Sequence, residues 1–244
     1  MLLAGKVAVI TGAGPGLGRT LATLMAHEGA TVVPVARTPH GIPGEVCADV
    51  TDPAQMRDLA ERVRADVLVN AAFPGTHRRN ILDMSVIDML DWQRAVNIGA
   101  YGTLVACRFF APHMVARGEG AIVNVTSMSS RKGYAGRSDF AAGKAAAHLL
   151  SHCLADELGP SGVRVNCVAP GWIASEVLDD WMRARADAEG VPYEEIRDRD
   201  VRAMALRRIA TEEDVARAII FLASDQARAI TGATIDVNAG QLFT

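Results

Sequence analysis

The sequence predicts one α/β domain in which a parallel, seven-stranded sheet is covered by helices on both faces. Short β-branched apolar segments alternate along the chain with segments of helical apolar spacing, a pattern typical of doubly wound folds. The 244 residues, 50% of them hydrophobic and 22% charged, suffice for one well-cored domain and leave little room for a second. We therefore expect residues 1–244 to form a single domain.

The strands are expected where β-branched apolar runs end at glycine, proline or polar residues. The first run stops at a glycine cluster, and the second contains Pro34. Because proline cannot donate a ladder hydrogen bond, Pro34 must face outward or distort its strand. The expected strands cover residues 6–11, 31–36, 47–49, 66–70, 121–126, 164–168 and 234–237.

The helices are expected between these strands, where apolar residues recur every three or four positions. Gly29 ends the first helix, and Asp52 and Pro53 are suited to be the cap and first residue of the second. The expected helices cover residues 17–28, 53–64, 89–116, 138–158 and 212–223, with a polar helical stretch over 179–205.

Charge and composition exclude several classes of protein. The net charge of −3, from 25 basic and 28 acidic residues, provides no field for a nucleic acid. No apolar run approaches the roughly 18 residues of a membrane span, and residues 1–10 lack the features of a signal peptide. We expect a cytoplasmic protein without a membrane partner. No metal site is expected, and the four cysteines are expected to be buried thiols: Cys47, Cys107, Cys153 and Cys167.

A glycine-rich turn between the first strand and the first helix predicts a dinucleotide site. At such a turn, backbone N–H groups and the helix dipole favour a pyrophosphate. Leu17 breaks the commonest G-x-G-x-x-G spacing, so the turn fits T-G-x-x-x-G-x-G instead. The candidate cofactor-binding residues in this turn of a Rossmann fold are Gly12, Gly14, Pro15, Gly16, Leu17 and Gly18.

The end of the second strand indicates which dinucleotide binds. An acidic residue there would bind the ribose 2′-hydroxyl of NAD(H), but this sequence has Ala36 followed by Arg37. A guanidinium suits a 2′-phosphate, which favours NADP(H), although a solvated surface arginine is the ordinary alternative. Asp49, after the third strand, could accept a hydrogen bond from the adenine amino group.

Motifs over almost the whole chain resemble those of the short-chain dehydrogenase/reductase family. The turn resembles its cofactor turn, and Thr231-Gly232 near the last strand completes the pattern. Asn70, Ala71 and Ala72 resemble its N-N-A-G strand end in altered form. Asn97, Ser127 and Lys144 resemble its catalytic asparagine, serine and lysine, and residues 166–171 resemble its N-x-x-x-P-G segment.

The resemblance implies a carbonyl or alcohol substrate of small size and a definite set of roles. A tyrosine exchanges the substrate proton, Ser127 hydrogen-bonds the substrate oxygen, and Lys144 lowers the tyrosine pKa and holds the ribose. Asn97 would position a water that passes protons to Lys144, and a homotetramer or homodimer would form on the helices carrying both residues. Further cofactor contacts are implied for Val50, Pro170, Gly171 and Ile173.

The sequence departs from the family at the tyrosine, where it has Phe140. Positions 140 and 144 still share a helix face, and Ser127 keeps the family's spacing of thirteen residues. We rank an engineered knock-out with weakened activity first, because the other motif residues are intact. A natural enzyme that reduces an activated C=C or C=N bond comes second, and a non-catalytic NADP(H)-binding protein third. Tyr134, expected in a loop, is a poor substitute for the missing hydroxyl.

Substrate information comes from two segments. Residues 175–205 are expected to form a lid over an apolar pocket. The side chains that could line it, or pack the lid onto its own domain, are Trp172, Val177, Leu178, Trp181, Met182 and Met204. His77, Arg78 and Arg79 could meet an anionic substrate, although a solvated loop is the safer interpretation.

Overall fold

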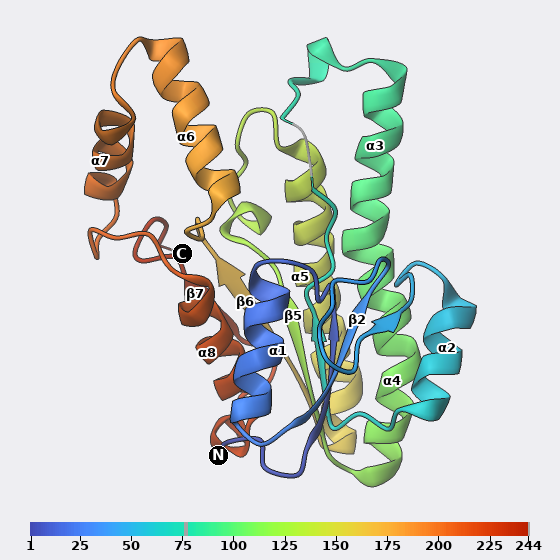
Figure 1. Ribbon diagram of the computed structural model, residues 1–244. Helices are drawn as coiled ribbons and strands as arrows, with labels where there is room; N and C mark the ends of the chain where they lie inside the picture. The colour runs from blue at the N-terminus through green and yellow to red at the C-terminus, as the bar shows by residue number, and fades with distance from the viewer. Residues whose placement is uncertain (76–77, 244) are drawn as a thin grey trace.

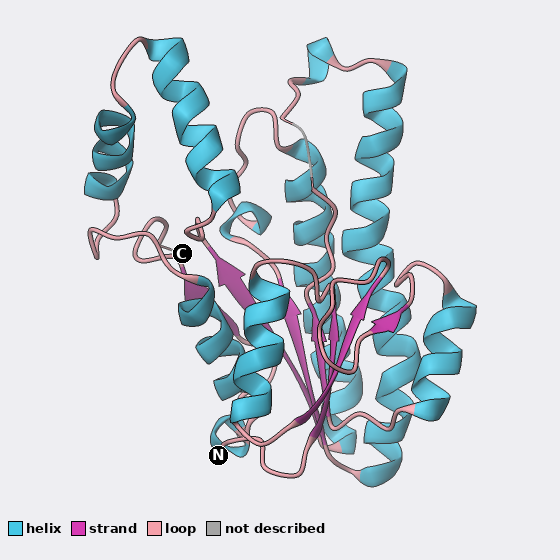
Figure 2. Ribbon diagram, in the orientation of Figure 1, coloured by secondary structure: helices cyan, strands magenta, loops and turns pink. Residues whose placement is uncertain are grey.

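The protein is seen here as a computed structural model that describes residues 1–75 and 78–243. Within these residues, seven strands form one sheet in the order β3-β2-β1-β4-β5-β6-β7, and every neighbouring pair is parallel. The predicted doubly wound fold is confirmed (Figure 2). The strands are β1 (Val7–Thr11), β2 (Thr31–Ala36), β3 (Val46–Cys47), β4 (Val67–Asn70), β5 (Gly120–Val125), β6 (Val163–Pro170) and β7 (Thr234–Val237).

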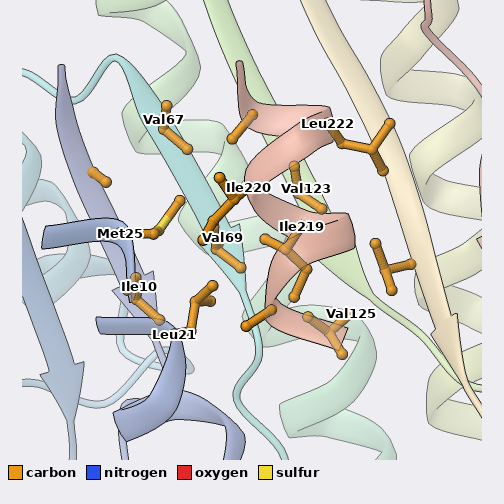
Figure 3. Close-up of a cluster of buried hydrophobic side chains, with 14 of the residues drawn as sticks. Ile10, Leu21, Met25, Val67, Val69, Val123, Val125, Ile219, Ile220 and Leu222 are labelled. Atoms are coloured by element: carbon orange, nitrogen blue, oxygen red, sulfur yellow. The ribbon is translucent and has the colours of Figure 1, made fainter. Parts of the chain in front are cut away.

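Helices cover both faces of the sheet (Figure 1). On one face, α1 (Leu17–His27) and α8 (Glu212–Ala223) bury apolar side chains against the strands, as Figure 3 shows for Leu21 and Ile219. On the other face lie α2 (Pro53–Arg62), α4 (Thr103–Arg117) and α5 (Ser138–Leu158). Each large aliphatic side chain buried in these two layers contributes about 1.5–3 kcal/mol to stability.

Three further helices rise beyond the carboxyl ends of the strands (Figure 1). They are α3 (Val86–Val96), which leads toward α4, and the pair α6 (Glu176–Glu189) and α7 (Tyr193–Ala203). Met182 of α6 and Ile196 of α7 are both fully buried where the pair packs. Nowhere in the part of the chain that the structure describes is a helix both long and apolar enough to cross a membrane.

The helix predicted over residues 89–116 is interrupted, which corrects that prediction. A π-helical segment, η2 (Asn97–Gly102), separates α3 from α4, and α3 begins earlier because Ser85 and Asp88 form a capping box. A Cβ atom on Gly102 would lie 2.7 Å from Val50 Cγ2, so η2 lies against the residues after β3. Wide turns of this kind often occur at functional sites.

Smaller predictions have mixed outcomes. Asp52 caps α2 through hydrogen bonds from the backbone N–H groups of Ala54 and Gln55, as expected. Pro34 precedes the part of β2 that pairs with β3, so the sheet edge is open there. The prediction of four buried thiols is wrong for Cys47 and Cys153, which are exposed because β3 is a short edge strand and Cys153 faces outward from α5.

Candidate functional site

The glycine turn after β1 brings the backbone of two strand ends into close contact. Gly12 has a φ of +76°, and a Cβ atom on it would lie only 2.4 Å from Ala72 Cα. A Cβ atom on Gly18 would lie 2.4 Å from the carbonyl oxygen of Gly12. Side chains are therefore excluded at positions 12 and 18, and the first backbone N–H groups of α1 face a space where a phosphate fits.

The turn opens onto a cavity of about 360 Å³, here called the dinucleotide cavity. Most of the predicted cofactor residues line it together: Gly12, Gly14, Pro15, Leu17, Gly18, Arg37, Asp49, Val50, Ala71 and Ala72. Gly16 does not line it and is instead the N-cap of α1. Asn70 lies buried beside it, and its amide donates to Asn124 Oδ1 at 2.8 Å. The cavity walls therefore suit one half of a dinucleotide.

The wall after β2 contains polar groups that the sequence analysis missed. Thr38 and His40 line the cavity beside Arg37, and Thr38 Oγ1 lies 3.5 Å from His40 Nε2. The Arg19 guanidinium holds this loop against α1 by donating to the carbonyl of His40 at 2.6 Å. The polar run directly after Ala36 was the signal that could have indicated them. Together they extend the expected phosphate-binding wall beyond one arginine.

Asp49 is more constrained than the sequence suggested. Its Oδ1 accepts hydrogen bonds from the backbone N–H and the hydroxyl of Thr51, at 2.8 and 2.7 Å. The carboxylate thus fixes the turn that leads into α2 while remaining in the cavity wall. It can take part in adenine binding only in the orientation that this turn imposes.

Ser127 follows β5 and lies at the edge of a second cavity of about 460 Å³, here called the substrate cavity. Its hydroxyl donates to the carbonyl of Pro170 at 3.4 Å and accepts from the backbone N–H of Ser129 at 3.1 Å. Gly171 and Ile173 line the same cavity. The structure therefore brings the predicted serine together with the predicted residues after β6.

Lys144 is buried beneath this arrangement, with only 5% of its surface exposed. Its ammonium group donates to the carbonyl of Val125 at 2.6 Å, and burial lowers its pKa to about 8. The Nζ atom lies 6.0 Å from the centre of the Phe140 ring, so the two side chains share one face of α5 as expected. Neither of the two cavities includes Lys144 in its wall.

Phe73 separates Lys144 from the dinucleotide cavity. It occupies the fourth position of the altered N-N-A-G motif, lines that cavity, and lies 5.0 Å from Lys144 Nζ by its ring centre. Its ring meets Phe140 edge to face, with the centres 4.9 Å apart. Cβ atoms on Gly99 and Gly143 would lie 3.0 and 3.2 Å from Phe73 Cε2, so both glycines make room for this ring.

Asn97 and Tyr134 lie in different surroundings. Asn97 begins the π-helical segment and is exposed, and its amide makes no hydrogen bond among the described residues. Tyr134 lies in the loop after β5, as expected, where its hydroxyl contacts Met128 Sδ at 3.6 Å and its side chain lines the substrate cavity.

Some of the expected lid residues line the substrate cavity, and others pack the lid onto its own domain. Trp172, Val177, Leu178 and Trp181 line the substrate cavity, whereas Met182 and Met204 are buried in packing.

Among the basic residues after β4, His77 lies outside the described residues. Arg78 lines the cavity, and Arg79 pairs with Asp88 at 3.4 Å. Arg137 was missed by the sequence analysis, although its place before α5 indicated proximity to Phe140.

Known proteins resemble this chain over almost its whole length. The family model described as Enoyl-(Acyl carrier protein) reductase matches residues 12–241. The 3-oxoacyl-(acyl-carrier-protein) reductase FabG of Thermotoga maritima is 33% identical over 98% of this chain and 99% of the relative. Meso-2,3-butanediol dehydrogenase of Serratia marcescens is 35% identical over 96% of this chain and 94% of the relative. A solved structure titled short chain dehydrogenase/reductase family protein is 34% identical, with a TM-score of 0.83 and 98% of each chain covered.

Proposed function

Because the chain belongs to the short-chain dehydrogenase/reductase family, we propose that it is an NADP(H)-dependent oxidoreductase that interconverts a carbonyl and an alcohol on a small organic substrate. One arrangement carries the proposal: the glycine turn and Arg37 line one cavity, and Ser127 and Gly171 line a second one. A cytoplasmic homotetramer or homodimer is part of the same proposal.

The residues present fit NADP(H). The turn from Gly12 to Gly18 would hold the pyrophosphate with backbone N–H groups, and Arg37 would bind the 2′-phosphate. Ala36 leaves no carboxylate at the position that would repel this phosphate. The bound cofactor would supply or accept a hydride at the substrate carbon.

The chain's own contribution is to hold the substrate oxygen and exclude water. Ser127 would donate a hydrogen bond to that oxygen, and the side chains of α6 would cover the substrate. Reduction of a carbonyl needs one hydride and one proton, and Phe140 carries no group that can donate the proton. We therefore expect the protein to bind its cofactor normally and to turn over ketones weakly.

A second candidate function is supported by the ring of Phe73. Gly99 and Gly143 leave space for this ring, and the ring in turn packs against Phe140. These contacts place an apolar ring against position 140, at a motif position where the family has glycine. A site of this kind would reduce an activated C=C or C=N bond, in which the hydride adds to carbon and the balancing proton comes from water instead of a phenol, and the matching family is itself described as an enoyl reductase.

The cofactor proposal is tested by titrating the protein with NADPH and NADH. We expect NADPH to bind about 10- to 100-fold more tightly, because a charge-assisted phosphate contact contributes about 1–3 kcal/mol. Arg37→Ala should remove most of this preference. The matched control is Arg108→Ala, which removes an exposed arginine from α4 outside both cavities. Equal dissociation constants in the parent protein would contradict the NADP(H) assignment.

A further inference from the structure

The substrate cavity has an unusual balance of charge for a protein with a net charge of −3. Two arginines, Arg78 and Arg137, line it, and none of its described lining residues is acidic. The rest of the wall consists of aromatic and aliphatic side chains together with serine hydroxyls. A ligand in this cavity therefore meets positive charge without a compensating carboxylate.

Arg137 lies directly against the candidate catalytic position. Its guanidinium carbon is 4.5 Å from the centre of the Phe140 ring, and the side chain is half-buried. Burial lowers the pKa of Arg137, and the nearby charge of Asp139 opposes this shift without cancelling it. The nearest acid in sequence, Asp139, uses Oδ1 to accept the backbone N–H of Phe140 at 2.7 Å. Among the described residues, no carboxylate forms an ion pair with Arg137.

Arg78 lies in the loop after β4, which runs beside the loop that carries Arg137: the backbone N–H of Arg79 donates to the carbonyl of Gly136 at 3.1 Å. Arg185 provides a comparison. Both guanidinium groups lie over the Trp181 ring of α6, at 4.3 and 4.7 Å from its centre. Arg185 is paired with Asp200 at 2.5 Å, whereas Arg78 has no acidic partner within the described ranges. Burial and then the charges of Arg137 and Arg185 lower the pKa of Arg78. An anion between Arg78 and Arg137 would relieve this repulsion.

We infer that the substrate of this site carries a carboxylate, bound by Arg78 and Arg137, a few bonds from the carbonyl held at Ser127. The inference rests on the proposed oxidoreductase function and names its substrate class. Guanidinium groups bind carboxylates through paired hydrogen bonds, and the apolar wall can enclose the remainder of a small oxo acid. Trp172, Leu178 and Trp181 supply that wall. The two arginines are thus specificity-determining residues rather than solvated loop residues.

Binding measurements separate this inference from the question of turnover. The probes are 2-oxo-4-phenylbutanoate and its ethyl ester, which differ in the charge of one group. Each is titrated calorimetrically into the parent protein, with and without saturating NADP⁺, conditions under which a ketone is not reduced. We expect the oxo acid to bind at least about 10-fold more tightly than the ester, as one or two charge-assisted hydrogen bonds allow.

Three variants locate the effect. Arg78→Gln and Arg137→Gln should each remove most of the preference for the oxo acid and leave ester binding within a few-fold of the parent. Arg185→Gln is the matched control. It removes a guanidinium group that lies over the same Trp181 ring but is already paired with Asp200, and this variant should keep the preference for the oxo acid. Equal binding of acid and ester to the parent, or an undiminished preference in both variants, would overturn the inference. Failure of NADP⁺ to bind while the oxo acid still binds would count against the proposed function alone.

Discussion

Lys144 shows how single residues in this site depend on their neighbours. Its ammonium group is almost fully buried, has one carbonyl partner, and lies near two aromatic rings. A buried charge with so few partners costs stability, which is why its pKa is lowered from 10.5 to about 8. In the unfolded chain the same side chain keeps its ordinary pKa, so the two states bind different numbers of protons.

The first prediction concerns the pH dependence of stability. Between pH 8 and 10.5 the unfolded chain binds more protons at Lys144 than the native protein does, so the free energy of unfolding rises with pH in this window. In Lys144→Met this contribution is absent. The stability of the variant relative to the parent should therefore fall by about 2 kcal/mol from pH 7 to pH 9.5.

Urea unfolding of both proteins at the two pH values measures this difference, and other titrating groups cancel in the comparison. Lys132→Met, at an exposed lysine, is the control and should show no such change. A difference between Lys144→Met and the parent that does not vary with pH would mean that Lys144 keeps its ordinary pKa.

At the scale of elements, the sheet and its covering helices could be predicted from the sequence, because each depends on apolar periodicity that is local to the segment. The π-helical segment could not, since nothing in its apolar spacing distinguishes it from the helix around it. In this segment Gly99 packs close to Phe73 and Gly102 packs close to Val50, and both partners lie far away in sequence.

The candidate site was predictable where residues follow motif spacing, as for the glycine turn, Ser127 and Lys144. It was not predictable where the chemistry arises from loops that meet only in the fold. Arg78 and Arg137 come from two such loops, and both are brought to Ser127 in one cavity. Phe73 lay within a motif, but its contact with Phe140 required the loop after β4 to meet α5 in the fold.

The second prediction tests whether α5 is shaped around Phe73. Gly143→Ala should gain about 1 kcal/mol of helix propensity, but its Cβ atom would lie 3.2 Å from the Phe73 ring, which offsets the gain. In a Phe73→Ala background that contact is absent, so the same substitution should stabilise the protein by about 1 kcal/mol more. Gly133→Ala, where a Cβ atom meets nothing within 4 Å, is the control and should behave alike in both backgrounds. Additive effects of Gly143→Ala and Phe73→Ala would show that the ring does not constrain this face.

At the scale of the whole molecule, apolar side chains remain exposed on the helices that carry Asn97 and Lys144. Leu104 of α4 is 42% exposed and Leu149 of α5 is 66% exposed, and α3 adds Ile87 and Leu90. Large apolar side chains exposed on neighbouring helices are candidates for an interface with another copy of the chain. These residues support the proposal that the protein assembles through this face.

The third prediction is that replacing Leu104 and Leu149 together by glutamate dissociates the assembly, because four or more buried charges would disfavour the interface. Sedimentation should give a dimer or tetramer for the parent and a monomer for the double variant. Leu206→Glu, at an apolar residue that is 62% exposed after α7, should leave the parent assembly intact. A parent protein that sediments as a monomer would contradict the proposed assembly.

The central claim is that this site is arranged for carbonyl and alcohol chemistry and lacks the hydroxyl that would carry the proton. The most direct measurement compares the parent with Phe140→Tyr across ketones and activated enones, with NADPH. We expect tyrosine to raise ketone reduction by roughly 10²–10⁴-fold, the usual contribution of a positioned acid. The rise should appear mainly in kcat, because phenylalanine already fills the volume of the ring. A parent that already reduces ketones rapidly, with no gain from tyrosine, would contradict the claim.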